Sequence, residues 1–471
     1  MAAHTPLDLA HQTEGCQFLR DNEAAALFDE QGLGKSKQVI DAIAAQIADG
    51  VIGAALIVCP NGLKSNWAGE IEKFCNLPYA VFGSGRAERR IAFQSLKAGF
   101  YVINYEAVIA ELPSLKALLR FRHIALILDE SHRIKTPEAK TTRAIHALRS
   151  LATRRYILSG TPVANKPEDL WAQMLFLDDG CALGASFDEF KKIYGSSSSG
   201  YQNLDQLRDR VAARSMRRLK AGTLDLPDKR YRRVRVPLAE RQSQMYETMR
   251  DDLALWVQKM DGEQVLASAE AILARLVRLA QLASNPAMVD AAYREQPAKF
   301  LALDSLLSTY LQEPNQKVLL WTSFVENIGA LRERYAQWRP VCIHGEVGVQ
   351  ERDTAVRSFK TDAETRLLIA NPAAAREGLT LTEASVAIYV DRTFNLVDYL
   401  QSQDRIHRIS QTRACDIVLL VAQNTVDEFI DFTLEQKHRL AQYAQADKAS
   451  LAAEDALLAK PDEIRRLIHR I

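Results

Sequence analysis

Short apolar runs alternate along the chain with longer stretches in which apolar positions recur at helical spacing. In the first half, runs that predict buried strands occupy 24–28, 55–59, 101–104, 124–128 and 156–159. Residues 238–285 carry a helical pattern without a strand signal. Further strands are then predicted at 317–323, 340–343, 366–370, 386–390 and 417–421. This alternation predicts an α/β fold with two units, each built on a parallel sheet that helices cover on both faces.

A glycine-rich turn follows the first apolar run and precedes a helical stretch. Gly32 and Gly34 would let backbone N–H groups surround phosphate oxygens, because glycine adopts positive φ without penalty. The following helix N-terminus would add partial positive charge. Lys35 would reach the β- and γ-phosphates, and Ser36 the Mg²⁺. Since Asp29 replaces the first glycine of the usual pattern, an ordinary glycine-containing helix start stays open on this pattern alone.

Two adjacent acids, Asp129 and Glu130, end the apolar run at 124–128. A buried strand that delivers two carboxylates in this way suits phosphoryl transfer. The first acid holds Mg²⁺ through its coordination shell, and the second polarises the attacking water. The pair alone could be a solvated strand end. Its position downstream of the glycine-rich turn favours ATP hydrolysis with Mg²⁺.

The bulk composition is that of a globular protein larger than one ordinary domain. The chain has 471 residues, of which 47% are hydrophobic and 25% charged. No apolar run approaches the roughly 18 residues of a membrane span, and no signal-peptide layout begins the chain, so no membrane association is expected. Six scattered cysteines without a C-x-x-C pair predict free thiols in a reducing compartment, cytoplasmic or nucleoid-associated.

Basic residues concentrate in one segment although the net charge of the chain is only +1. Residues 208–235 contain eleven arginines and lysines against three aspartates. Such a run is usually a solvated face, but it is also the pattern of a polyanion-binding surface. A loose loop is predicted at 195–200 from its glycines and serines.

A set of short motifs in fixed order resembles the Swi/Snf family of superfamily 2 helicase-like ATPases. The motifs of the first half are Gln12, the loop 29–36, Asn66-Trp67, Asn104-Tyr105-Glu106, the acidic (DEAH) box 129–132 and the coupling motif 158–162, and Arg217-Arg218 with Leu226-Pro227 resembles the junction between the two lobes. Those of the second half are His344-Gly345, Glu351-Arg352, 378–382 and 401–411. In this family Asp is usual where Asp29 stands, so the departure noted above is accounted for.

The resemblance implies two RecA-like lobes. The first lobe is expected at 1–225 with a helical protrusion at about 165–215, and the second at 226–440 with a helical insertion at about 238–298. A helical tail is expected at 441–471. No accessory module fits the remaining length, so the chain is expected to be a bare motor that works alone or with separate protein subunits.

The resemblance also assigns residues to the ATP site. The nucleotide-binding candidates are Gln12, which would read adenine, then Asp29, Glu30, Gln31, Gly32, Leu33, Gly34, Lys35, Ser36 and Gly378. The catalytic candidates are Lys35, Asp129, Glu130, Arg405 and Arg408, and the metal ligands are Ser36 and Asp129. Arg405 and Arg408 are three residues apart, so they would share one face of a helix and act as arginine fingers. The hinge between the lobes is expected at 222–237.

The function implied is an ATP-dependent translocase on double-stranded DNA that contacts the backbone without reading sequence. The DNA-binding candidates are Lys64, Asn66, Trp67, Tyr105, Thr161, Thr322, Ser323, His344, Thr380 and Thr382. Two alternatives stay open. One is a strand-separating DNA or RNA helicase, and the other is a nucleotide-gated adaptor that binds DNA without productive turnover.

Three departures from the family pattern lie in the second half. Ala374 and Ala375 replace paired glycines, Thr393 and Phe394 replace an aromatic pair, and Ser410 replaces a glycine of the last motif. They affect the details of coupling and DNA contact more than the ATPase assignment.

Overall fold

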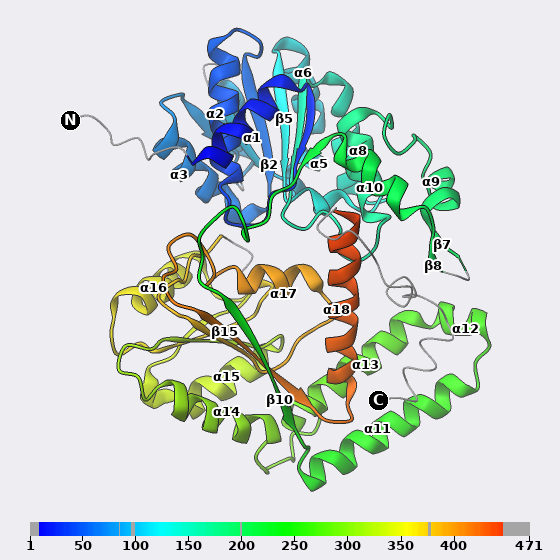
Figure 1. Ribbon diagram of the computed structural model, residues 1–471, viewed down its shortest axis with the longest axis vertical. Coiled ribbons are helices and arrows are strands. Elements are labelled where there is room, and N and C mark those ends of the chain that lie inside the picture. Colours follow the sequence, from blue (N-terminus) through cyan, green and yellow to red (C-terminus); the bar gives the residue numbers. More distant parts are fainter. Residues whose placement is uncertain (1–8, 84, 96–98, 198–199, 375–377, 446–471) are drawn as a thin grey trace. The chain divides into compact units, whose positions relative to one another are not determined.

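The computed structural model describes residues 9–83, 85–95, 99–197, 200–374 and 378–445. Within these ranges the chain divides into two units (Figure 1). Unit 1 comprises the described parts of Met1–Asp225 and Arg439–Ala456, and unit 2 those of Leu226–His438. No helix in the described ranges is both long and apolar enough to span a membrane. Ala375 and the predicted tail beyond residue 445 lie outside the described residues.

Unit 1 is built on a seven-stranded sheet whose strand pairs are all parallel. The strands in spatial order are β3 (Tyr79–Val81), β4 (Phe100–Asn104), β2 (Ala54–Cys59), β5 (Ile124–Asp129), β6 (Arg154–Leu158), β1 (Ala24–Leu27) and β9 (Ser215–Met216). β2 is buried along its whole length, as expected for a parallel strand that is covered on both faces. The carboxyl ends of β1, β5 and β6 therefore meet at one edge of the sheet.

Helices cover both faces of this sheet (Figure 1). The helices of this unit are α1 (Ala10–Asp21), α2 (Lys35–Ala48), α3 (Lys64–Phe74), α4 (Arg86–Gln94), α5 (Tyr105–Ala110), α6 (Leu112–Phe121), α7 (Lys140–His146), α8 (Asp169–Asp178), α9 (Phe187–Tyr194) and α10 (Leu204–Ala212), of which α9 lies to the side of the sheet (Figure 1). Single 3₁₀ turns lie at Asn61–Leu63, Ser131–Ile134 and Arg149–Leu151. On one face, Val39 and Ile43 of α2 and Ile71 of α3 share a core with Ile57 and Ile127 of the central strands.

The segment predicted as a loose loop at 195–200 is partly ordered as a hairpin. β7 (Ser196–Ser197) pairs antiparallel with β8 (Gly200–Tyr201), and the two residues between them lie outside the described part. The prediction of a loop was therefore wrong for Ser196, Ser197 and Gly200, because their backbones pair in two short strands.

Unit 2 is built on a six-stranded, wholly parallel sheet. Its strands in spatial order are β10 (Lys229–Val236), β15 (Cys415–Ala422), β14 (Val386–Tyr389), β11 (Val318–Trp321), β13 (Leu367–Ala370) and β12 (Val341–Ile343). Its helices are α11 (Glu240–Gln258), α12 (Gly262–Ala267), α13 (Ala269–Ser284), α14 (Ala298–Tyr310), α15 (Val325–Arg334), α16 (Val349–Thr361), α17 (Leu396–Gln403) and α18 (Val426–Ala444), the last of which ends in residues assigned to unit 1. Single 3₁₀ turns lie at Pro286–Met288 and Ala336–Trp338. The predicted fold class, with two parallel α/β units and a helical insertion, is confirmed.

Strand β10 occupies the second half of the predicted hinge at 222–237 and part of the basic run, and the boundary between the two units, after Asp225, lies in the first half of that hinge. All eight residues of β10 pair with β15. Three of its five basic side chains are paired with acids from distant parts of the chain: Lys229 with Asp404 at 3.3 Å, Arg230 with Asp416 at 2.7 Å and Arg233 with Asp431 at 2.6 Å. These three charges therefore lie on an edge strand beside neighbouring carboxylates.

Candidate nucleotide-binding site

The glycine-rich loop joins β1 to α2 as predicted. Gly32 and Gly34 have φ values of 89° and 79°, a left-handed conformation that glycine adopts without strain. Gly34 is the residue immediately before α2, whose N-terminus therefore faces the loop. A Cβ atom on Gly34 would lie 2.4 Å from Nε2 of Gln12, so α1 brings the predicted adenine-reading residue against the loop. The arrangement can surround phosphate oxygens with backbone N–H groups.

Lys35, the first residue of α2, donates hydrogen bonds to backbone carbonyls of the loop. Its Nζ donates to the carbonyl oxygen of Asp29 at 2.7 Å and to that of Glu30 at 3.3 Å. Burial lowers the pKa of Lys35, and the carboxylates of Glu130, Asp29 and Asp129 oppose this effect. Phosphate oxygens of a bound nucleotide could therefore replace these carbonyl oxygens as acceptors for the ammonium group.

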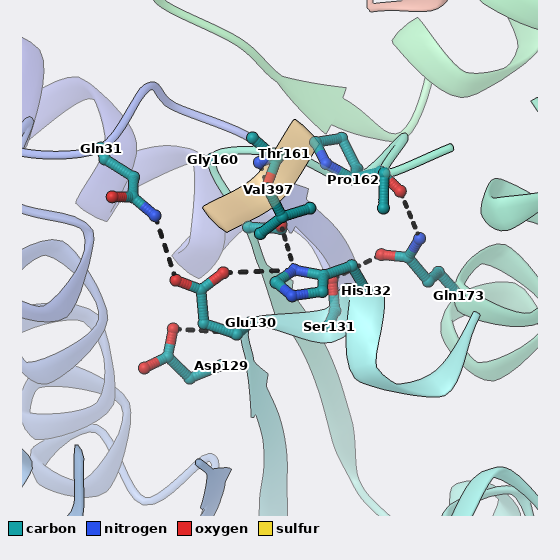
Figure 2. Close-up of polar contacts among 12 residues, drawn as sticks. Gln31, Asp129, Glu130, Ser131, His132, Gly160, Thr161, Pro162, Gln173 and Val397 are labelled. Atoms are coloured by element: carbon teal, nitrogen blue, oxygen red, sulfur yellow. Dashed lines mark hydrogen bonds and ion pairs between the residues drawn. The ribbon is translucent and has the colours of Figure 1, made fainter. Parts of the chain in front are cut away.

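The two predicted acids lie at the carboxyl end of β5 (Figure 2). Asp129 is the last residue of the strand, and its pKa is raised to about 6 by burial and by the neighbouring Glu130. Glu130 adopts a left-handed conformation with φ of 52°, which is uncommon for a residue with a side chain. Its Oε1 accepts from Nε2 of Gln31 at 3.2 Å, so the loop and the acidic box are joined directly. Strain of this kind concentrates at functional sites.

A line of side-chain contacts continues from Glu130 to the coupling motif (Figure 2). Nδ1 of His132 lies 3.3 Å from Oε2 of Glu130 and 3.4 Å from Oγ of Ser159. Oγ of Ser159 also accepts from the backbone N–H of Thr161 at 3.1 Å. The phosphate loop, the acidic box and the coupling motif are therefore linked by hydrogen-bonding side chains.

A glutamine of α8 also joins the acidic box to the coupling motif. Oγ of Ser131 donates to Oε1 of Gln173 at 2.6 Å, and Nε2 of Gln173 donates to the carbonyl oxygen of Pro162 at 2.8 Å (Figure 2). Gln173 is fully buried, so this amide fixes the distance between the two motifs. No motif of the sequence pointed to Gln173 as part of the site.

Arg218 is a further site residue, and sequence reasoning placed it only at the junction between lobes. Its Nε and Nη2 donate to Oδ1 and Oδ2 of Asp29 at 3.0 and 2.6 Å, a bidentate pair with a fully buried carboxylate. Nη2 also donates to Oε1 of Gln38 at 2.7 Å. The available signal was Asp29 itself, because an acid at a buried loop position requires a cationic partner.

Arg217 connects the same segment to two backbone carbonyls. Its Nη1 donates to the carbonyl oxygen of Phe28 at 2.5 Å and to that of Gly160 at 3.3 Å. β9 pairs in parallel with β1, which brings the residues that follow Met216 beside the phosphate loop. Both arginines of the predicted junction motif therefore stabilise the nucleotide loop.

Arg405 and Arg408 do not lie on a helix, which corrects the prediction. α17 ends at Gln403, and both arginines occupy the turns that follow. Beyond Gln403 the chain continues in turns, in which the backbone N–H of Arg405 donates to the carbonyl oxygen of Ser402 and that of Ile406 to the carbonyl oxygen of Gln403, both at 3.3 Å. The amide of Gln411 donates to the carbonyl oxygens of Ile406, Thr382 and Ala384, at 3.0, 3.2 and 2.9 Å, and so ties these turns to residues 382–384.

The two guanidinium groups nevertheless converge on one segment of unit 2. Arg405 donates from Nη1 to the carbonyl oxygen of Leu379 at 3.4 Å. Arg408 donates from Nη1 to the carbonyl oxygen of Gly378 at 3.3 Å and to Oγ1 of Thr380 at 2.7 Å. The two last motifs of the sequence are therefore brought together as one cluster.

Trp67, Tyr105 and Thr322 are three of the four predicted DNA-contacting side chains that are buried inside their own units. Trp67 and Tyr105 are each 1% exposed and donate hydrogen bonds to Asp129. Thr322 is fully buried, and its hydroxyl donates to Asp391 at 2.8 Å. The prediction that these side chains contact DNA directly is wrong in this structure, since packing and polar partners take them away from the surface.

The other DNA-binding candidates occupy several environments. Asn66 is exposed at the start of α3, and Nζ of Lys64 donates to the carbonyl oxygen of Phe82 at 2.8 Å. Oγ1 of Thr382 lies 2.9 Å from Oγ of Ser410, a residue that replaces a family glycine. Those that are partly buried are Lys64, Ser323, His344, Thr380 and Thr382, and Thr161 is buried in the coupling motif.

The donor set fits Mg²⁺. Asp129 and Ser36 supply the hard oxygen atoms that this ion prefers. Within the described ranges no group of three or more His, Cys, Asp or Glu side chains could form a metal site by itself. Mg²⁺ needs no such group, because it is usually bound by one or two protein carboxylates and completes its coordination shell with water and substrate phosphates.

Comparison with known families decides the assignment. The SNF2-related domain matches residues 11–288, which is more than half of the chain. The chain belongs to the SNF2-related family. The helicase conserved C-terminal domain matches residues 298–410 of this SNF2-family chain. These are the domains of a helicase-like, DNA-dependent ATPase, so the predicted family and enzyme class are confirmed.

Individual relatives cover most of this SNF2-family chain. It is 27% identical to a chromodomain-helicase-DNA-binding protein 1-like protein of Danio rerio, over 96% of this chain and 46% of the relative. It is 29% identical to a putative ATP-dependent helicase/translocase of Bacillus subtilis, over 90% of this chain and 47% of the relative. The chain thus spans less than half the length of these relatives. Among solved structures, the Sulfolobus solfataricus SWI2/SNF2 ATPase core in complex with double-stranded DNA is 25% identical, covers both chains fully and has a TM-score of 0.44.

Proposed function

We propose that this SNF2-family protein is an ATP-dependent translocase that moves along double-stranded DNA. The observation that carries the proposal is the line of contacts from Gln31 through Glu130 and His132 to Ser159. It joins the loop that would bind phosphate, the acid that would activate water and the motif that would couple hydrolysis to movement. The relatives named as ATP-dependent helicases or translocases support the same reading.

In this proposal, Lys35 and the backbone N–H groups of the loop bind the β- and γ-phosphates. Ser36 and Asp129 hold Mg²⁺, which when bound neutralises charge on the phosphate oxygens. Glu130 polarises the attacking water, while Gln31 and His132 hold its carboxylate in place. Products are ADP and phosphate.

The arginine cluster of unit 2 is assigned to the transition state. Arg405 and Arg408 would stabilise the charge of the transferred phosphoryl group, an effect worth about 10³–10⁵ in rate where it has been measured. Their Nη1 atoms donate to backbone carbonyls of 378–379 and to one hydroxyl, acceptors that an anionic ligand can replace, while their Nε atoms donate to the carbonyl oxygens of Gln401 and Asp404. The role requires closure of the two units on ATP.

DNA is proposed to contact the exposed start of α3 and the polar segments of unit 2. Lys64, Asn66, His344, Thr380 and Thr382 offer donors that position a phosphate backbone without reading bases. The basic run contributes less than its composition predicts, because many of its charges are paired within the protein. We also propose that the protein works with separate protein subunits. We place it in the cytoplasm or at the nucleoid, where a reducing environment suits six free thiols.

The proposal is tested by ATP turnover measured without nucleic acid, with single-stranded DNA, with duplex DNA and with RNA. Duplex DNA should stimulate turnover most. Glu130→Gln should bind ATP without turnover, while Glu138→Gln, at an exposed acid eight residues further on, should behave as wild type. Equal stimulation by single strands or RNA would favour the strand-separating helicase. Absence of any stimulation would favour the adaptor.

A further inference from the structure

Asp129 receives hydrogen bonds from two helices that the catalytic proposal does not use. Nε1 of Trp67, in α3, donates to its Oδ2 at 2.8 Å. The hydroxyl of Tyr105, the first residue of α5, donates to its backbone carbonyl oxygen at 2.7 Å. Both side chains are 1% exposed, so water does not compete for these bonds. The position of the carboxylate is therefore tied to the positions of α3 and α5.

The same two helices begin at the protein surface. α3 starts at Lys64, and Asn66, immediately before Trp67, is exposed. Glu106, which follows Tyr105, is also exposed. Less than one helical turn thus separates surface positions from the side chains that hold Asp129. Because a helical turn is rigid and Trp67 is packed in the core of the unit, a displacement of the start of α3 must move the indole N–H.

We propose that Trp67 is a positioning residue that transmits DNA contact at the start of α3 to Asp129. The inference rests on the proposed function, since it assumes that duplex DNA engages the surface near Asn66. Contact with the DNA backbone shifts α3, and the indole N–H then moves Oδ2 of Asp129 within the ATP site. Tyr105 restrains the backbone of the same residue, so the side chain rather than the strand responds. The hydrogen bond from Trp67 to Asp129 thereby links DNA contact to ATP turnover.

The first test compares Trp67→Phe with Trp171→Phe. Trp171 is a matched control, because it lies in the same unit, is 6% exposed and donates from Nε1 to the carbonyl oxygen of Gly184 at 3.0 Å. Loss of a hydrogen bond to a charged acceptor should reduce the ratio of DNA-stimulated to basal kcat about tenfold or more in Trp67→Phe. KM for ATP and affinity for duplex DNA should change little. Trp171→Phe should keep the wild-type ratio.

A second measurement uses the wild-type protein and does not depend on turnover. The chain has five tryptophans, and 5-fluorotryptophan labelling gives each a ¹⁹F resonance. Phe variants of the other four, Trp171, Trp256, Trp321 and Trp338, assign the Trp67 resonance by elimination. A short duplex DNA, added without nucleotide, should shift the Trp67 resonance and leave that of Trp171 in place. An unmoved Trp67 resonance in the presence of saturating DNA would overturn the inference even if Trp67→Phe failed to fold.

The two levels of the proposal fail differently. A wild-type protein whose turnover ignores duplex DNA would overturn the proposed function and this inference together. Wild-type stimulation that persists in Trp67→Phe would overturn the inference alone and leave the translocase intact.

Discussion

The pair between Arg218 and Asp29 gives the sharpest prediction for the nucleotide loop. Arg218→Met removes both guanidinium bonds at 3.0 and 2.6 Å and leaves a fully buried carboxylate without its cation. Breaking a buried ion pair by removing one partner costs about 3–5 kcal/mol. Arg230→Met is the matched control, since Arg230 also bonds an aspartate, Asp416, at 2.7 Å but is 65% exposed. Exposed pairs contribute about 0–1 kcal/mol.

Hydrogen exchange locates this cost. The backbone N–H of Glu30 donates to the carbonyl oxygen of Arg218 at 2.9 Å, so its exchange reports opening of the loop. A loss of about 3 kcal/mol should accelerate this exchange by about 100-fold or more in Arg218→Met, and ATP affinity should fall with it. Adding Asp29→Asn should recover part of the loss, because the unpaired charge is removed. Exchange in Arg218→Met that matches the Arg230→Met control would refute the anchoring role.

Four further predictions concern the acids, the arginine cluster and the core. Glu130→Gln should keep ATP affinity and lose turnover; continued turnover would remove its role in activating water. Arg408→Ala should lower kcat with little change in nucleotide affinity, and equal loss of both would argue against action in the transition state. Burial raises the pKa of Asp129 to about 6, above its unfolded value, so ionisation weakens the fold as pH rises through this range. Asp129→Asn should therefore stabilise the ligand-free protein at pH 7.5 but not at pH 3.5, measured by thermal melting; equal effects at both values would contradict the buried charge. Lys299→Met should lower the melting temperature strongly, because it removes the cation of a buried ion pair with Asp427 at 2.5 Å. Removing one partner of such a pair costs about 3–5 kcal/mol of folding free energy, and an unchanged melting temperature would contradict this reasoning.

Local patterns predicted the parts of the site that depend on neighbouring residues. The glycines of the phosphate loop, the helix after them and the strand that ends at Asp129 are each specified within a few residues. The central strands are buried on both faces, so their apolar runs are continuous and easily recognised. For the same reason, the alternation of apolar runs with helical stretches was enough to predict two sheets.

Contacts between distant residues account for what was missed. Asp29 and Arg218 are 189 residues apart, and no local pattern pairs them. β10 lacks an apolar signature, because five of its eight residues are basic, and three of these pair with acids that lie more than 170 residues later. The turns that carry Arg405 and Arg408 are tied to the backbone carbonyls of 382 and 384 by the amide of Gln411, a contact between segments that the local pattern does not show. Spacing alone therefore suggested a helix there.

Trp67 shows why a motif does not give the direction of a side chain. Its place in the motif made it a DNA-binding candidate, although a tryptophan at such a position is more often part of the core, and its indole does pack with Ile71 and Ile57 in the core. The bond from its N–H to Asp129 became visible only once α3 and β5 were placed in one unit.

The central claim, movement along duplex DNA without strand separation, is tested most directly by displacement of a third strand from a DNA triplex, with an unwinding assay run in parallel. The account predicts that the third strand is released with ATP but not with a non-hydrolysable analogue, while the underlying duplex stays paired. Release of a strand from the duplex itself, or an intact triplex despite DNA-stimulated hydrolysis, would contradict it.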